Sequence, residues 1–184
     1  MIVIKLGGSL SQAETLVSCL DRLEQQYNDK PIVIVPGGGA FADQVRLAQG
    51  RWQFDDITAH RMAILAMQQM ALLIHGLKSQ FTIVTSTLDI KQRLKKGEVL
   101  IWSPTIDELD MASVPASWDI TSDSLAAWLA KTIQAEELIL VKSARIDKNL
   151  TLEQLAEQQI IDQGFCQIVS AATFKINIIN QQNL

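Results

Sequence analysis

Two glycine clusters in the sequence each follow directly on an apolar run of the type that forms β-strands. The first cluster is Gly7-Gly8-Ser9, and the second is Gly37-Gly38-Gly39. A glycine turn that leads into a helix leaves backbone N–H groups uncovered, and such a site binds anions, phosphate above all. Two such turns at the same end of neighbouring strands would bring two phosphate-bearing ligands face to face.

Lys5 adds a positive charge just before the first turn. It stands inside the apolar run 2–6, where burying an ammonium group costs free energy unless an anion neutralises it. At the carboxyl end of this strand, where ligands of open α/β sheets bind, Lys5 could reach a phosphate held by the turn. The alternative is an edge-strand lysine whose ammonium group extends to water.

A third group of polar residues precedes an apolar helical segment. Asp119, Thr121, Ser122 and Asp123 lie within five positions of one another. We expect Thr121, Ser122 or Asp123 to cap the helix. Because a second aspartate exceeds what one cap needs, Asp119 and Asp123 could also order a lysine, a magnesium ion or a substrate ammonium group.

The glycine clusters do not match the two best-known nucleotide-binding motifs. Ala42 stands where the fingerprint G-x-G-x-x-G requires its last glycine, and no G-x-x-x-x-G-K-[ST] occurs in the chain. His60 and His75 are the two histidines, and they lie far apart in the sequence. We therefore expect no metal ion held by the protein itself.

The composition is that of an ordinary globular protein, with 48% apolar and 20% charged residues. A net charge of −4 argues against a nucleic-acid partner. No apolar run reaches the roughly 18–20 residues that span a bilayer, so we expect no membrane segment. A strand begins at residue 2, so we also expect no signal peptide. Cys19 and Cys166 lie in apolar helical contexts, which favours buried free thiols and a cytoplasmic protein.

Apolar runs typical of strands alternate with helical patterns along the whole chain. Strands are predicted at residues 2–6, 31–35, 80–85, 98–102, 137–142 and 175–179. Helices are predicted at residues 12–28, 40–49, 57–78, 88–95, 122–134, 151–157 and 162–172, and an irregular or mobile loop at 103–119. Since most strands are apolar on both faces, we expect an α/β fold: a three-layer αβα sandwich with a mainly parallel sheet, in a single domain spanning residues 1–184.

The predicted helix at 57–78 is apolar on most of its surface. Ile64, Met67, Ala71 and Ile74 form one stripe at helical spacing, and further leucines occupy the remaining faces. Such a helix is either central in the core or shared with a second subunit. We expect a homodimer or a higher homo-oligomer, and the alternative is a buried helix in a monomer.

The order of these motifs along the chain resembles the amino acid kinase family. The matching segments are Lys-Leu-Gly-Gly-Ser at 5–9, Pro-Gly-Gly-Gly at 36–39, Thr-Ser-Asp-Ser-Leu-Ala-Ala-Trp-Leu-Ala at 121–130 and Leu-Ile-Leu-Val-Lys at 138–142. The family includes acetylglutamate, aspartate, carbamate, uridylate and isopentenyl phosphate kinases. The resemblance covers nearly the whole chain and implies an ATP-dependent phosphotransferase with the family's αβα fold.

The resemblance also implies a role for each motif. Lys5 and the turn Gly7–Ser9 would hold the ATP phosphates, and the turn Gly37–Gly39 would face the phosphate acceptor. Asp123 would be the aspartate that positions the lysines, and Asp119 would touch the transferring group. The implied catalytic groups are Lys5, Asp123 and the amide of the middle glycine of the first turn, Gly8.

Three features depart from the family's pattern. The late Gly-Met-x-x-Lys segment, with its second phosphate-binding lysine, is replaced by Asp162-Gln163-Gly164-Phe165, and Lys142 is our candidate for that lysine's role. The usual nucleotide loop is replaced by Ser143-Ala144-Arg145-Ile146-Asp147. Asp43 stands where isopentenyl phosphate kinases carry a histidine, which disfavours that substrate.

Within the family, the short chain looks most like the kinases of methanofuran biosynthesis, which convert aminomethylfuran-methyl phosphate to its diphosphate. This likeness implies ATP and Mg²⁺ as cofactors and a small-molecule phosphate acceptor as partner. The residues expected to bind the acceptor are Gly37, Gly38, Gly39, Asp43, Asp119 and Thr121. Two alternatives remain: a carboxylate or carbamate kinase of the same family, and a non-catalytic nucleotide-binding subunit. A Rossmann dehydrogenase is a more distant third.

Further side chains could complete the acceptor site. Asp43 could pair with the substrate ammonium group. The candidates for an apolar lining around the ring are Phe41, Trp52 and Phe54, each with core packing as the alternative. His60 could point at the substrate, or cap its helix or pack at an interface. Arg46 and Arg51 could contact the acceptor phosphate or remain solvated.

Overall fold

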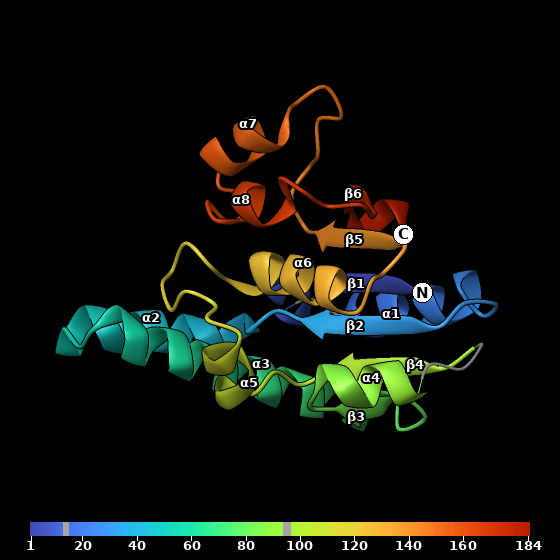
Figure 1. Ribbon diagram of the computed structural model, residues 1–184, viewed down its shortest axis with the longest axis horizontal. Helices are drawn as coiled ribbons and strands as arrows, with labels where there is room; N and C mark the ends of the chain where they lie inside the picture. Colours follow the sequence, from blue (N-terminus) through green and yellow to red (C-terminus); the bar gives the residue numbers. More distant parts are fainter. Residues whose placement is uncertain (13–14, 94–96) are drawn as a thin grey trace.

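The computed structural model describes residues 1–12, 15–93 and 97–184, and these residues form one six-stranded sheet (Figure 1). The strands are β1 (Ile2–Leu6), β2 (Ile32–Pro36), β3 (Thr82–Val84), β4 (Val99–Trp102), β5 (Glu137–Lys142) and β6 (Lys175–Asn180). Their order across the sheet is β3-β4-β2-β1-β5-β6, and each neighbouring pair is parallel. The strands predicted from the apolar runs, and their parallel arrangement, are therefore confirmed.

Helices cover both faces of this sheet, as the predicted αβα sandwich requires (Figure 1). They are η1 (Gly8–Gln12), α1 (Thr15–Gln26), α2 (Gly39–Trp52), α3 (Asp56–Leu77), α4 (Thr87–Arg93), α5 (Ile106–Met111), α6 (Ser122–Thr132), α7 (Leu152–Glu157), α8 (Phe165–Val169) and η2 (Gln181–Asn183), where η denotes a 3₁₀ helix.

The alternation of side chains along β1 sorts them between the two layers. Ile2, Ile4 and Leu6 pack with α1 and α3, whereas Val3 belongs to the core that includes α6. Because side chains two residues apart point to the same face of a strand, Lys5 shares the face of Val3. The strand's own geometry thus directs this lysine toward α6.

The segment 103–119, predicted as an irregular loop, contains the helix α5 (Ile106–Met111). Its first turn is stabilised locally, because the side-chain oxygen of Thr105 accepts a hydrogen bond from the amide of Glu108. Leu109 buries its side chain in the core. A capped start and a single buried anchor are enough for this short helix, and the loop prediction was wrong here.

Three other predicted helices differ in extent. The predicted helix at 12–28 is divided into η1 and α1, and residues 13 and 14 lie outside the described part of the chain. The helix predicted at 88–95 is α4, and residues 94 and 95 are likewise outside it. The helix predicted at 162–172 is reduced to α8, because Asp162 turns toward the start of α6 and bonds to it.

Helix α3 has 22 residues and, within the described residues, is the one helix whose length and composition would suffice to cross a membrane. The helix is no continuous apolar run, because polar residues such as Arg61, Gln68 and His75 interrupt it. The helix packs on α2 and against β2, β3 and β4. In its most apolar stretch of 18 residues, 44% is buried inside the protein. These contacts are those of a helix that belongs to the folded core.

The two glycine turns touch each other at the carboxyl ends of β1 and β2. Parallel pairing sets Leu6 opposite Pro36, and the amide of Gly37 donates a hydrogen bond to the carbonyl of Leu6 at 2.9 Å. A Cβ atom at Gly8 would lie 2.5 Å from the amide nitrogen of Gly39. The backbones approach so closely that no side chain fits between them.

Replacement of Gly8 by alanine should destabilise the fold, because the added methyl group would overlap a backbone atom held by the paired strands. We expect a loss of about 1–3 kcal/mol in the free energy of unfolding, measured by urea denaturation. Gly76→Ala is the matched control, because a Cβ there meets nothing within 4 Å. It should leave stability unchanged or raise it by up to about 1 kcal/mol. Equal stability of both variants would contradict the close contact.

Candidate functional site

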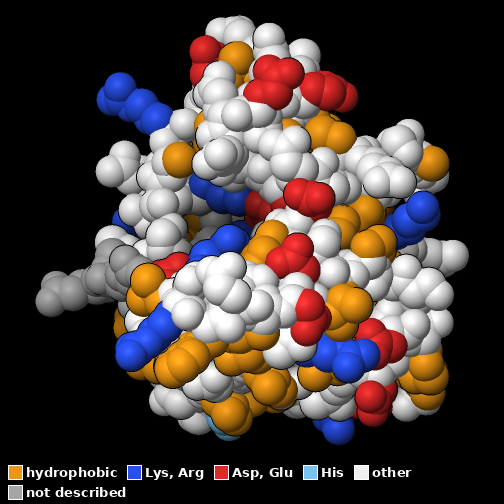
Figure 2. Space-filling view, turned by 90° about the vertical axis from the view of Figure 1, so that its left-hand side faces the viewer, with side chains coloured by type: hydrophobic (Ala, Val, Ile, Leu, Met, Phe, Trp, Pro, Cys, Tyr) orange, Lys and Arg blue, Asp and Glu red, His pale blue; other side chains and the backbone are white. Residues whose placement is uncertain are grey.

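Charged side chains gather where the strands end. Figure 2 looks onto this edge of the molecule and shows lysine or arginine side chains next to acidic ones near the middle of the face. Lys5 lies near the end of β1 and Lys142 at the end of β5, and the two strands are neighbours in the sheet. The first turn of α6 brings Asp123 to the same place.

Asp123 forms ion pairs with both lysines. Its Oδ1 lies 2.7 Å from Nζ of Lys5, and its Oδ2 contacts Nζ of Lys142. All three side chains are largely buried, and that of Asp123 is only 3% exposed. One carboxylate thus faces two ammonium groups, and the carboxylate of Asp162 lines the same cavity. Two buried ammonium groups beside two glycine turns favour a bound anion.

The pKa values in the trio reflect this crowding. Burial by itself raises the pKa of Asp123, but the charges of Lys5 and Lys142 outweigh it and hold that pKa well below its ordinary value. Burial, aided by the charge of Lys5, lowers the pKa of Lys142 to about 8. An anion bound beside Lys142 would favour the protonated form of this lysine.

Asp162 caps helix α6, a role that the sequence analysis assigned to the residues at the start of the helix itself. Its carboxylate accepts hydrogen bonds from the amides of Thr121 and Ser124, at 2.8 and 2.9 Å, and from Oγ1 of Thr121 at 2.8 Å. Burial and the negative charge of Asp123 raise the pKa of Asp162. Since 38 residues separate Asp162 from Ser124, no local pattern could have revealed this contact.

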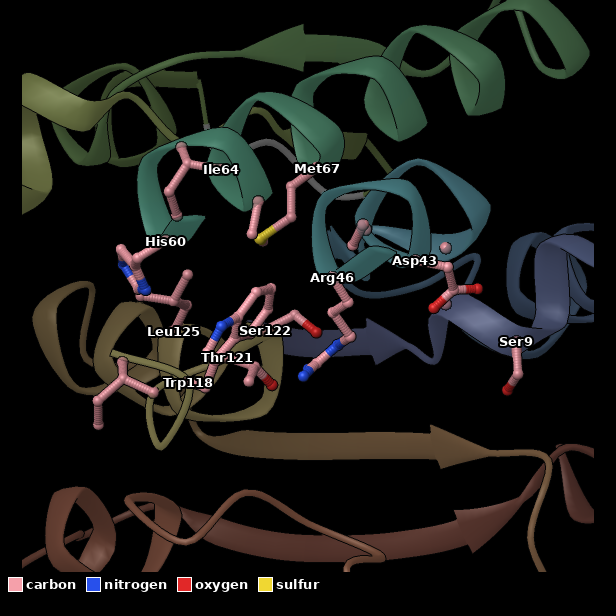
Figure 3. A pocket seen from close by; sticks show the side chains of 16 residues that line it. Ser9, Asp43, Arg46, His60, Ile64, Met67, Trp118, Thr121, Ser122 and Leu125 are labelled. Atoms are coloured by element: carbon pink, nitrogen blue, oxygen red, sulfur yellow. The ribbon is translucent and has the colours of Figure 1, made fainter. Parts of the chain in front are cut away.

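A cavity of about 210 Å³ opens beside the glycine turns (Figure 3). Of the residues predicted to bind phosphates or acceptor, those that line it are Gly8, Ser9, Gly38, Gly39, Asp43 and Thr121, together with Arg46 and His60 from the further candidates. Its walls are mainly apolar and include Ile64 and Met67 from α3, Leu125 from α6, and Trp118 from the loop before α6. One end of the cavity thus presents backbone amides, and its body suits an uncharged ring or chain.

Trp118 is the aromatic residue of this cavity, and the sequence analysis did not single it out. Its Nε1–H donates to Oε1 of Gln49 at 2.7 Å, and the guanidinium carbon of Arg46 lies 3.8 Å from its ring centre. Both partners belong to α2, so they hold the loop before α6 over that helix.

The aromatic residues proposed from the sequence lie elsewhere. The cavity lining includes none of Phe41, Trp52 and Phe54, and the side chain of Trp52 is 70% exposed. Arg51 is not in the lining either; its guanidinium carbon lies 5.0 Å from the ring centre of Trp52. The aromatic side chain in the cavity wall is instead that of Trp118, from the loop before α6, which local sequence patterns do not place.

A second cavity of about 520 Å³ adjoins the first. It contains Lys5, Asp123, Lys142 and Asp162, and it shares Arg46, Trp118 and Thr121 with the first cavity. Oγ of Ser9, at the first glycine turn, lies 2.8 Å from Oγ of Ser143, which follows β5. The site therefore has a positively charged chamber and an apolar chamber, and they meet at Arg46.

Asp119, predicted to touch the transferring group, lies outside both cavities. Its side chain is exposed and lines a separate hollow with Gln163 and Gly164. The reason is the neighbouring Ile120, whose side chain is buried in the core, so that Asp119 faces outward. Gly7 and Gly37 are buried behind the turns, where their amides bond to the carbonyls of Val141 and Leu6.

Within the described residues, no group of three or more histidine, cysteine, aspartate or glutamate side chains could hold a metal ion. Both carboxylate oxygens of Asp123 are already engaged by lysines. The Mg²⁺ implied by the resemblance therefore finds no set of protein ligands here. This ion is commonly bound through substrate phosphates, with few protein ligands.

The comparison with known families agrees with this arrangement. The amino acid kinase family model matches residues 1–145, a stretch that contains both glycine turns, Asp123 and Lys142. The chain belongs to the amino acid kinase family. The match ends before Asp162, so the residue that caps α6 lies beyond the part that the family model describes.

One characterised kinase is similar to this chain in sequence. [5-(aminomethyl)furan-3-yl]methyl phosphate kinase from Methanocaldococcus jannaschii is 32% identical over 144 residues, which cover 76% of this chain and 64% of that protein. The chain thus spans slightly less than two thirds of this relative.

Solved structures show the same fold. Uridylate kinase from Archaeoglobus fulgidus superposes with a TM-score of 0.71 at 18% identity, covering 99% of this chain and 92% of that one. UMP kinase from Ureaplasma parvum gives a TM-score of 0.68 at 16% identity, covering 97% and 88%. At these identities the likeness concerns the fold alone.

The lowered pKa of Lys142 predicts a pH-dependent affinity for ATP. Below about pH 8 this lysine is protonated and would attract the phosphates of a bound nucleotide, and above that value it loses its charge. ATP binding, measured by calorimetry without metal, should therefore weaken roughly tenfold between about pH 7.5 and 9.5. In Lys142→Met, ATP binding at about pH 7.5 should be weaker, and the loss of affinity between about pH 7.5 and 9.5 should be much smaller. An equal loss of ATP affinity with pH in both proteins would contradict deprotonation of Lys142 as its cause.

Proposed function

We propose that this protein is an ATP-dependent small-molecule kinase that phosphorylates a phosphate monoester. The observation that carries the proposal is the contact between two glycine turns beside the trio of Lys5, Asp123 and Lys142. Phosphoryl transfer requires mainly positioning and neutralisation of charge, and little covalent chemistry from the protein. This site supplies both.

In the proposed reaction, the ATP phosphates lie against Lys5 and Lys142 in the charged chamber and extend to the first glycine turn, whose Gly8 and Ser9 line the adjoining apolar chamber. The acceptor lies in the apolar chamber, with its phosphate at the second turn. The γ-phosphoryl group then passes between the turns, where the backbones of Gly8 and Gly39 are close together. Asp123 keeps the two lysines apart and oriented, so that their charge meets the phosphoryl oxygens.

A phosphate monoester suits this site as acceptor because its oxygen is already ionised. Such a nucleophile needs no general base, and the trio consists of a paired carboxylate and two ammonium groups. The similarity to the aminomethylfuran phosphate kinase supports the finer proposal that the acceptor is aminomethylfuran-methyl phosphate. A small cavity walled by Trp118, Ile64 and Met67 suits a single ring.

Self-association through α3 is part of the proposal. Exposed apolar side chains along this helix are Ile57, Leu65, Leu72, Leu73 and Leu77, which lie between 39% and 63% exposed. They support the homodimer expected from the sequence, with α3 in the interface. A cytoplasmic location also remains a proposal, consistent with the free thiols of Cys19 and Cys166.

Lys5→Met tests the proposed reaction. We expect the variant to lose about a hundredfold to a thousandfold in kcat, because a charge aimed at the transferring group is removed. ADP release is measured with a panel of phosphate monoesters, carboxylates and carbamate. Lys131→Met is the control, since Lys131 is exposed near the end of α6, and its kcat should be unchanged.

The outcomes separate the alternatives. Turnover of a carboxylate or of carbamate, and of no phosphate monoester, would indicate an acyl phosphate-forming kinase. Tight ATP binding without turnover of any acceptor by the unmodified protein would indicate a nucleotide-binding subunit. Thermal unfolding of both lysine variants checks that each is folded before its activity is compared.

A further inference from the structure

The apolar cavity has two different ends (Figure 3). Ser9 and Asp43 lie at the end formed by the glycine turns, and His60 lies at the opposite end. The side chains of Met67 and Trp118 project into the space between them. A ligand whose phosphate sits at the glycine turns would therefore extend its other end toward His60.

His60 is held in a defined orientation by one hydrogen bond. Its Nδ1 lies 3.1 Å from the carbonyl oxygen of Ser117, and since a carbonyl only accepts, Nδ1 carries the proton. Burial lowers the pKa of His60, although the Ser117 carbonyl and Asp110 oppose this, and the lowered pKa favours the neutral ring.

In a neutral ring with a proton on Nδ1, the second nitrogen, Nε2, is an acceptor. Within the described residues His60 makes the bond to Ser117 and no other, while its side chain lines the cavity. An acceptor in an otherwise apolar wall is matched by a ligand that brings a hydrogen-bond donor to it.

We propose that Nε2 of His60 receives an amine or ammonium group at the end of the acceptor opposite its phosphate. The inference rests on the proposed function and names the acceptor class: small phosphate monoesters that carry a terminal primary amine. It also reassigns the amine partner from Asp43, because Asp43 lies at the phosphate end and the ligand would have to fold back to reach it.

The test compares two acceptors that differ in one group. One is a ring-bearing phosphate monoester with an aminomethyl substituent, and the other carries a methyl group in its place. The ratio of their kcat/KM values, from ADP release, measures recognition of the amine. In His60→Asn the side-chain amide can still donate to Ser117, but the acceptor at the position of Nε2 is gone.

We expect His60→Asn to lower the amine preference about tenfold to a hundredfold, the range for a hydrogen bond to a charged group. The kcat/KM for the methyl acceptor should stay nearly unchanged, which a general structural defect would not produce. His60→Gln, whose side-chain oxygen can take the place of Nε2, should recover part of the preference.

His75→Asn is the matched control. His75 lies on the same helix, its Nδ1 is 2.8 Å from the carbonyl oxygen of Phe81, and it is not in the cavity lining. This variant should keep the full amine preference. Asp43→Asn should change kcat/KM for both acceptors alike and also keep the preference.

An unchanged preference in His60→Asn, or its loss in Asp43→Asn alone, would overturn the inference. If the unmodified protein phosphorylates neither acceptor, the proposed function fails for this class of acceptor. Calorimetric binding of the two phosphate monoesters to the unmodified and His60→Asn proteins then still decides the role of His60, and equal affinities of both ligands for both proteins would count against it.

Discussion

The ion pairs of Asp123 with Lys5 and Lys142 are the interaction on which the site depends. Two largely buried ammonium groups would repel each other, and one carboxylate between them makes their close approach tolerable. The carboxylate of Asp162 lines the same chamber and interacts with both lysines and with Asp123. The two ammonium groups beside the amides of the glycine turns are the groups that an anion would meet here.

A second constraint is geometric. The parallel pairing of β1 with β2 sets the ends of both strands level, and the glycine turns that follow are forced into backbone contact. The parallel pairing of β1 with β5 likewise brings Lys142 close to Lys5. The same sheet edge thus carries the amides of two turns and the charges of two lysines, without any residue reaching across the molecule.

Helix α6 links these features to the rest of the chain. Its first turn supplies Asp123 to the lysines, and its free amides are satisfied by Asp162 from the segment before α8. The capping contact from Asp162, in the C-terminal part of the chain, therefore helps to hold Asp123 in place. Helix α3 also has two distinct faces, because one face walls the apolar cavity and another exposes leucine side chains.

The local sequence was sufficient for the strands, for most helices and for the placement of Lys5 and the glycine turns. These features follow from apolar periodicity and from the backbone freedom of glycine, which act between near neighbours in the chain. Trp118, Asp162 and the depth of His60 depend on contacts between segments far apart in sequence, as with Asp162 and Ser124, which are 38 residues apart. The outward turn of Asp119 depends on the burial of Ile120. Packing against elements distant in sequence decides where these side chains lie, and no local pattern in a single sequence reveals that packing.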